Sequence, residues 1–166
     1  MRLVASLLVA TTMACGGPSA PAETTPVTPA AATPAAAKLL VYVDDSGVGL
    51  GGNDPVAYIA DLEVVPGSQE HTSQHGGAIY RFASAEHKVA FDAAADQHAP
   101  EYGGYCAFAA SQNRLSETDP TVFQVIDGQL LLFTDLSYKQ QFNVDARGNK
   151  AKADQYWPGL VARHGT

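Results

Sequence analysis

The stretch GGPSAPAETTPVTPAAATPAAA, Gly16 to Ala37, most narrowly limits what this chain can fold into. It consists mainly of alanine, proline and threonine and has almost no large apolar residue. Such a segment cannot bury enough apolar surface to offset the entropy lost on ordering, and its repeated prolines favour a semi-extended spacer. We therefore predict a tether over residues 16–37 and one globular domain over residues 38–166, which is long enough to bury a core.

The segment before this stretch has the features of an export signal. A basic residue is followed by an apolar run, Leu3 to Ala10, that is too short to span a bilayer. The sequence TTMAC then resembles a bacterial lipoprotein signal, although Thr12 stands where that signal usually has leucine. The resemblance implies a signal peptide over residues 1–15 that ends at a lipidated Cys15. The membrane partner is then reached through a lipid anchor, and the protein is exported to the periplasmic side of a bacterial membrane, with the outer membrane favoured. A secretory signal that is cleaved nearby without lipidation is the alternative.

The charge and the motif content exclude several classes of function. The formal net charge of −7 at pH 7 argues against nucleic-acid binding, which normally requires a basic patch. It also disfavours electrostatic adhesion to anionic lipid. The sequence contains no G-x-S-x-G elbow, phosphate-binding loop, dinucleotide fingerprint or H-E-x-x-H motif. We therefore expect no nucleic-acid partner and favour a binding protein over an enzyme.

Two parts of the domain have strand-like patterns. VFQVIDGQLLLF, residues 122–133, places two β-rich runs around Asp127-Gly128, which is the composition of a tight hairpin turn. GAIYRF, residues 77–82, is aromatic and β-branched and predicts another strand. The turn signal Asn53-Asp54-Pro55 precedes VAYI, where we expect a further strand to begin.

The helices are expected later in the chain. Ser84 is a good N-cap for a helix of about three turns that ends before Pro100. Two more helical stretches are predicted over residues 137–144 and 150–156, with Trp157-Pro158 as the stop of the second. No internal repeat is evident. The predicted fold class is α+β, with a small mixed sheet, a strand hairpin and several short packed helices.

The domain has a single cysteine and a few histidines that could carry chemistry. Cys106 has no partner for a disulfide within residues 38–166, so it is a free thiol, a ligand or an intermolecular link, or else a small buried hydrophobe. His71 and His75 form H-x-x-x-H, but the polar, glycine-flanked context favours a solvated loop over a metal site.

Several motifs occur together in an order that resembles a known family. DPVAYI, YRFASAEHKVAF, APEYGGYCAF, VFQVIDGQLLLF and AKADQYWP are similar to the YHS domain, and in particular to the exported bacterial branch of YHS domain-containing (seleno)proteins. The resemblance extends over residues 49–158. Its metal-binding members carry D-P-V-C followed by Y-x-F-C-S-x-x-C, with cysteines that bind transition metals. This chain has Ala57 and Ala83 in place of the first two cysteines and His87 in place of the third.

The same resemblance directs attention to the motif YGGYCA. Selenium at related positions implies that Cys106 is a soft ligand or a nucleophile, and His87 is the expected second ligand, because thiolate and imidazole suit copper or zinc. Tyr80, Tyr102 and Tyr105 are expected to shape the pocket. The predicted function is metal handling or sensing with copper or zinc, which also allows a periplasmic protein partner. The alternatives are a thiol-redox protein that uses Cys106 and a degenerate YHS scaffold for protein interaction that binds no metal.

Overall fold

The helices and strands occur in the same order in two halves of the chain. The computed structural model describes residues 38–166; the predicted signal peptide, Cys15 and the tether lie outside the described residues. The first half comprises η1 (Leu50–Gly52), α1 (Pro55–Ala60), β1 (Ser68–His75), β2 (Ala78–Phe82), α2 (Ala85–Ala93) and α3 (Ala95–His98). The second half comprises η2 (Glu101–Gly104), α4 (Ala107–Ser111), β3 (Asp119–Ile126), β4 (Gln129–Phe133), α5 (Leu136–Asn143) and α6 (Ala146–His164). The two halves thus share one order of elements, although no internal repeat is evident in the sequence.

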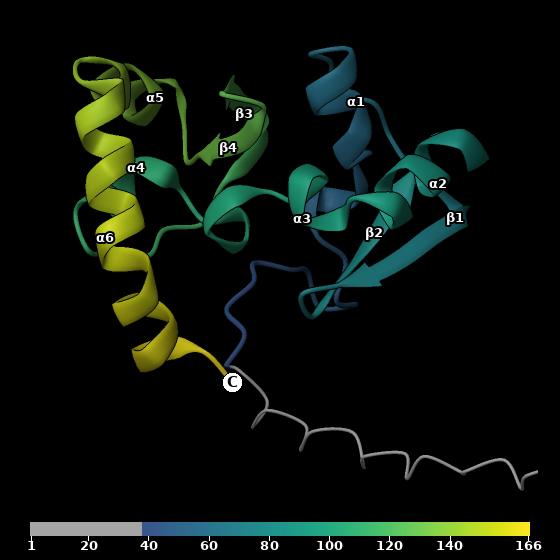
Figure 1. The fold of residues 1–166 in the computed structure, drawn as a ribbon, viewed down its shortest axis with the longest axis horizontal. Coiled ribbons are helices and arrows are strands. Elements are labelled where there is room, and N and C mark those ends of the chain that lie inside the picture. Colours follow the sequence, from purple (N-terminus) through teal and green to yellow (C-terminus); the bar gives the residue numbers. More distant parts are fainter. Residues whose placement is uncertain (1–37) are drawn as a thin grey trace, which may run out of the picture. The chain divides into compact units, whose positions relative to one another are not determined.

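The strands confirm the α+β class and change one detail of it. β1 pairs with β2 and β3 pairs with β4, so that the strands form two separate antiparallel hairpins (Figure 1). The parallel component of the expected mixed sheet is reduced to two isolated bridges, Val48 with Ile79 and Cys106 with Leu132. The hairpin predicted at Asp127-Gly128 is present. Both residues have positive φ, 53° and 78°, as a two-residue turn with primed geometry requires.

The helix starts follow their capping residues. Ser84 accepts a hydrogen bond from the backbone N–H of His87 at the start of α2, as predicted. The strand expected over VAYI is instead the helix α1. Asp54 caps this helix and Pro55 occupies its first position, a combination that favours a helix start over a turn.

The last helix is longer than the sequence indicated. α6 begins at Ala146 and continues to His164, so that Pro158 lies inside it and is not its end. The exposed proline removes one backbone hydrogen bond, but the buried residues Ala153 and Leu160 on either side of it pack into the core. This packing offsets the local penalty. His164 is the last residue of the helix.

Each half has its own hydrophobic core, and β4 contributes to both. Leu130 and Leu132 pack with the first half, whereas Leu131 and Phe133 pack with the second, because alternate residues of a strand face opposite sides. We call the two clusters the first core (Leu50, Val56, Tyr58, Ala78, Tyr80, Phe82, Phe91, Leu130 and Leu132) and the second core (Tyr102, Cys106, Ala107, Ala109, Ala110, Val122, Leu131, Phe133, Phe142, Ala153 and Leu160).

The segment over residues 38–49 runs along both halves (Figure 1). Leu39 exchanges two backbone hydrogen bonds with Thr166, the last residue of the chain. The N–H of Tyr42 donates to the oxygen of Gly103, and the N–H of Gly49 donates to the oxygen of Ile79. This segment therefore connects the end of the chain, η2 and β2. None of the helices described here combines the length and the apolar character that a membrane crossing needs.

Candidate functional site

A buried carboxylate joins the start of α1 to the start of α2. Asp54 is fully buried and accepts hydrogen bonds from Val56 N (2.9 Å), Ala57 N (3.4 Å) and Ala83 N (2.8 Å). Its Oδ2 also lies 2.7 Å from Nδ1 of His87. Because an ionised carboxylate only accepts, Nδ1 of His87 carries the proton in this contact. The other ring nitrogen, Nε2, is free to act on a partner.

The sequence predicts His87 as a site residue, whereas it places Asp54 in a turn signal. An aspartate directly before a proline that opens a helix was the available signal. The side chain of His87 is 29% exposed, and its contact with Asp54 fixes the orientation of the ring. A carboxylate behind an imidazole is a common way to orient a histidine ligand or base. Here the pair also connects two helix starts, which is a structural function in itself.

Cys106 lies in a different environment. It is the N-cap residue of α4, is 0% exposed, and belongs to the second core. Its backbone N–H donates to the oxygen of Ser116 at 3.1 Å, and its side chain makes no capping hydrogen bond. A sealed thiol among apolar side chains has the surroundings of a small packed hydrophobe.

The structure does not bring Cys106 and His87 together. Cys106 caps α4 and belongs to the second core, whereas His87 stands on α2 beside Asp54. The helices α2 and α4 lie apart in Figure 1. Within residues 38–166 no three His, Cys, Asp or Glu side chains are grouped as a metal site would require. The geometry therefore gives no support to a metal shared by these two residues.

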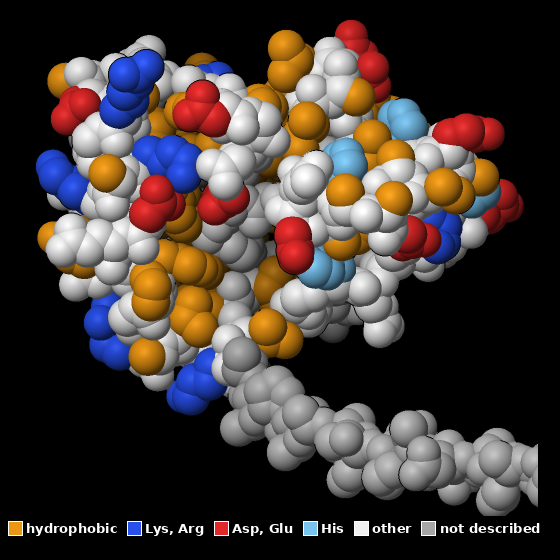
Figure 2. Space-filling model, in the orientation of Figure 1, with side chains coloured by type: hydrophobic (Ala, Val, Ile, Leu, Met, Phe, Trp, Pro, Cys, Tyr) orange, Lys and Arg blue, Asp and Glu red, His pale blue; other side chains and the backbone are white. Residues whose placement is uncertain are grey.

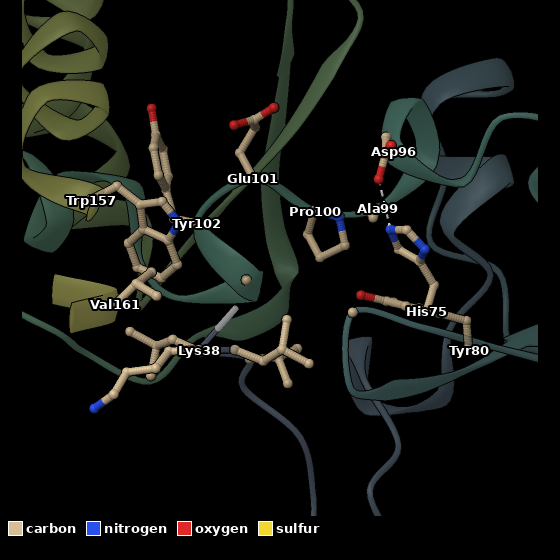
Figure 3. A pocket seen from close by; sticks show the side chains of 15 residues that line it. Lys38, His75, Tyr80, Asp96, Ala99, Pro100, Glu101, Tyr102, Trp157 and Val161 are labelled. Atoms are coloured by element: carbon tan, nitrogen blue, oxygen red, sulfur yellow. Dashed lines mark ion pairs between the residues drawn. The ribbon is translucent and has the colours of Figure 1, made fainter. Parts of the chain in front are cut away.

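A cavity of about 290 Å³ opens where the two halves meet the segment over residues 38–49. Figure 3 shows its walls: Trp157 and Val161 of α6 on one side, His75 with Asp96 on the other, and Pro100 between them. In the space-filling view, apolar side chains gather on the α6 side, and an acidic side chain and a histidine lie on the opposite side (Figure 2). Of the expected pocket residues, Tyr80 and Tyr102 line this cavity.

The aromatic wall is built by η2 and α6. Tyr102 and Tyr105 both pack against Trp157, with ring centroids 5.7 Å and 6.3 Å away. Trp157 thus contacts both tyrosines of the YGGYCA motif. Tyr102 donates its hydroxyl proton to Asp154 at 2.8 Å, and burial raises the pKa of its phenol. Burial likewise raises the pKa of Tyr80 to about 12, so all of these phenols are protonated at neutral pH.

The backbone conformation and the close packing of the YGGYCA motif explain why it contains glycine. Tyr102 and Gly103 both have positive φ, 53° and 57°, which a tyrosine rarely adopts. A Cβ on Gly103 would overlap with the backbone oxygen of Leu40, so only glycine fits there. Strained backbone of this kind is often found at ligand sites. The motif thus places an aromatic ring at the cavity, and its glycine allows the segment over residues 38–49 to approach the motif closely.

Polar groups line the other side and the edge of the cavity. Nε2 of His75 lies 2.9 Å from Asp96, whose side chain is largely exposed. His75 is on strand β1, not in the loop we expected, and so is His71. Glu101 accepts a hydrogen bond from Gln129 at 2.6 Å. Burial raises the pKa of the Glu101 carboxyl, and nearby Asp154 raises it further, against the opposing effect of Lys150.

Comparison with known proteins gives no further guide. No protein-family model, curated protein or solved structure matches the chain. Functional inference therefore depends on the site itself.

Proposed function

We propose that this protein is an exported, lipid-anchored binding protein of YHS-like build that holds a small organic cation in the cavity between its two halves. The observation that carries the proposal is the cavity: about 290 Å³, with an aromatic wall of Tyr102 and Trp157 and carboxylates at its edge. Ligand sites are typically concave, mainly apolar and placed where structural units meet. The volume suits a small molecule.

The chemistry of the walls favours a cation. Aromatic faces attract ammonium and guanidinium groups, by about 0.5–1 kcal/mol at exposed sites and more when the cation is desolvated. Asp96 and Glu101 add negative charge, and the chain as a whole has a formal charge of −7. Lys38 donates to the backbone oxygen of Ala162, and His75 lies against Asp96 at the cavity wall, so that an incoming cation would compete with His75 for this carboxylate.

Binding of copper or zinc by Cys106 and His87 stays a prediction from the family resemblance. It is tested by metal analysis of protein purified without a tag under reducing, anaerobic conditions and then incubated with each metal. Near one metal per chain, lost in both Cys106→Ser and His87→Ala, would establish a metal protein and contradict our proposal. The redox alternative needs an accessible thiol, and Cys106 is fully buried.

The proposal itself is tested with the fluorescence of Trp157, which is the only tryptophan of the chain. The probes are 2-phenylethylamine and 3-phenylpropionate, which share a phenyl group and differ in the sign of their charge. We expect saturable quenching or enhancement by the amine and a clearly weaker effect of the acid.

Two variants and a matched control locate the effect. Asp96→Asn and Glu101→Gln should each weaken amine binding about two- to fivefold, the range of a modest charge interaction. Asp92→Asn removes an exposed carboxylate of α2 that does not line the cavity and should leave the affinity unchanged. Equal affinity for both probes, or no saturable response, would refute the proposal.

A further inference from the structure

The two hairpins of the protein repeat one another at a constant spacing. β3 begins 51 positions after β1 (119 minus 68), and β4 begins 51 positions after β2 (129 minus 78). Both hairpins contain an irregularity at the same place: pairing shifts between Ser68 and Thr72 in the first and between Asp119 and Phe123 in the second. The helices α2 and α5 follow at the same spacing (136 minus 85).

The turns before the first helix of each half share an unusual backbone. Gly51 and Gly103 have φ and ψ of 59° and 22°, and of 57° and 22°; the glycines that follow have φ of 82° and 83°. The residues before them, Leu50 and Tyr102, also have positive φ, 57° and 53°. A bulky residue in this region costs about 1–3 kcal/mol. Two unrelated segments would not be expected to adopt the same costly conformation.

The hydrogen bonds around these turns also correspond. The N–H of Asp54 donates to Val65 O (2.8 Å), and the N–H of Cys106 donates to Ser116 O (3.1 Å). Lys88 N donates to the oxygen of Ser84, and, 51 positions later, Lys139 N donates to the oxygen of Asp135. Ser84 and Asp135 are the N-caps of α2 and α5.

From this correspondence we infer that the domain consists of two copies of one unit of about 51 residues, and that Cys106 and Tyr138 stand in the second copy where Asp54 and His87 stand in the first. Asp54 and Cys106 are the N-caps of α1 and α4. His87 and Tyr138 each donate their backbone N–H to the cap of their helix. This inference does not depend on the proposed ligand.

The correspondence of Cys106 with Asp54 explains why the YGGYCA motif has a thiol without a partner in the described part of the chain. In the first copy a buried carboxylate caps a helix and binds an imidazole; in the second copy both partners are replaced together. Cys106 makes no capping bond, and Tyr138 packs instead against Phe108, with ring centroids 5.7 Å apart. Loss of one partner alone would leave a buried charge or polar group unpaired, which is costly. Replacement of the pair avoids this.

The cavity also occurs twice. Next to the β3–β4 turn lies a second hollow of about 280 Å³, lined among others by Asp127, Arg147 and Lys150. These positions lie 51 residues after Gly76, Asp96 and Ala99, which line the cavity described above. The hollow beside the hairpin turn is therefore a feature of the unit. Because Arg147 replaces Asp96, the second hollow is not expected to take the same cation.

The equivalence is tested by rebuilding the Asp–His pair of the first copy in the second. The full chain is compared with Cys106→Asp, Tyr138→His and the double variant, and the melting temperature of each is measured at neutral pH. Cys106→Asp alone buries an unpaired charge and should lower the melting temperature strongly. Addition of Tyr138→His should recover about 5–10 °C, since one charge-assisted hydrogen bond shifts this temperature by that order.

Two further measurements keep the test decisive if Cys106→Asp does not fold. The reverse change is Asp54→Cys, alone and with His87→Tyr; the double variant should be the more stable of the two. In the rebuilt protein, NMR should show a protected imidazole N–H at position 138. Recovery in either direction supports the duplication. Strictly additive losses in both directions, with no protected imidazole N–H, would overturn it.

Discussion

Replacement of Asp54 by alanine should destabilise the protein far more than loss of an ordinary helix cap. Asp54 is fully buried and accepts four hydrogen bonds, which join α1 to the start of α2. The cap itself contributes about 1 kcal/mol. Removal of this carboxylate also leaves the N–H of Ala83 and the Nδ1 of His87 without their acceptor, which costs about 1–3 kcal/mol for each group. We therefore expect the free energy of unfolding to fall by about 3–5 kcal/mol in Asp54→Ala.

The chain contains a matched control for this change. Asp135 is also an N-cap aspartate, but it is exposed and accepts only the N–H of Tyr138 through its side chain. Asp135→Ala should therefore cost only about 1 kcal/mol. Asp54→Asn retains a good cap and should fall between the two.

The assay is equilibrium unfolding in urea, followed by the fluorescence of Trp157, with the slope of each transition compared between variants. The free energies are comparable only if that slope is unchanged. Losses in Asp54→Ala and Asp135→Ala that agree within about 1 kcal/mol would show that the buried pair with His87 contributes little. The structural account of the first half would then be wrong.

Four further outcomes follow from burial and geometry. In a urea titration, Gly103→Ala should lower the free energy of unfolding by about 1–3 kcal/mol more than Gly76→Ala. Both glycines have a φ of 57°, but only at Gly103 would the added Cβ meet backbone atoms, so equal losses would contradict the close contact. The pKa of Tyr80 is raised to about 12, so this residue contributes about 2–3 kcal/mol of stability that is lost as pH rises from about 10 to 12. Burial also raises the pKa values of Tyr58 and Tyr102, so Tyr80→Phe should reduce the loss of stability by about that amount without removing it; a pH profile that Tyr80→Phe leaves unchanged would contradict this. Burial raises the pKa of Glu101, so the contribution of its protonated carboxyl to stability is present in acid and lost as pH rises. The free energy of unfolding of Glu101→Gln should therefore increase relative to that of the wild type as pH rises towards neutral, and a relative decrease would contradict this. Cys106 should react with a thiol reagent only on unfolding, and rapid alkylation of the native protein would revive the redox hypothesis.

Local signals in the sequence predicted several elements correctly. Asp127-Gly128 indicated the hairpin and Ser84 the start of α2, because turn and cap preferences act over a few residues. The prediction of a turn and a strand at Asp54-Pro55 was wrong, because the same residue pair occurs in turns and at helix starts. Only the buried contacts of Asp54 decide between the two.

The repeat and the cavity were beyond the reach of local patterns. The copies share few identical residues at the 51-residue spacing, among them Phe82 with Phe133 and Phe91 with Phe142, so the duplication is visible chiefly in the backbone. The cavity walls come from distant parts of the chain, including residues 38–41, His75 and Trp157. No spacing rule connects such positions.

The most direct test of the proposed ligand site is an NMR titration of the isotope-labelled protein with 2-phenylethylamine. We predict saturable shifts confined to the cavity wall, at the amides of Val41, Gly76 and Gly103 and at the indole N–H of Trp157. Shifts that centre on α2 and His87, or no saturable shifts at all, would contradict the account.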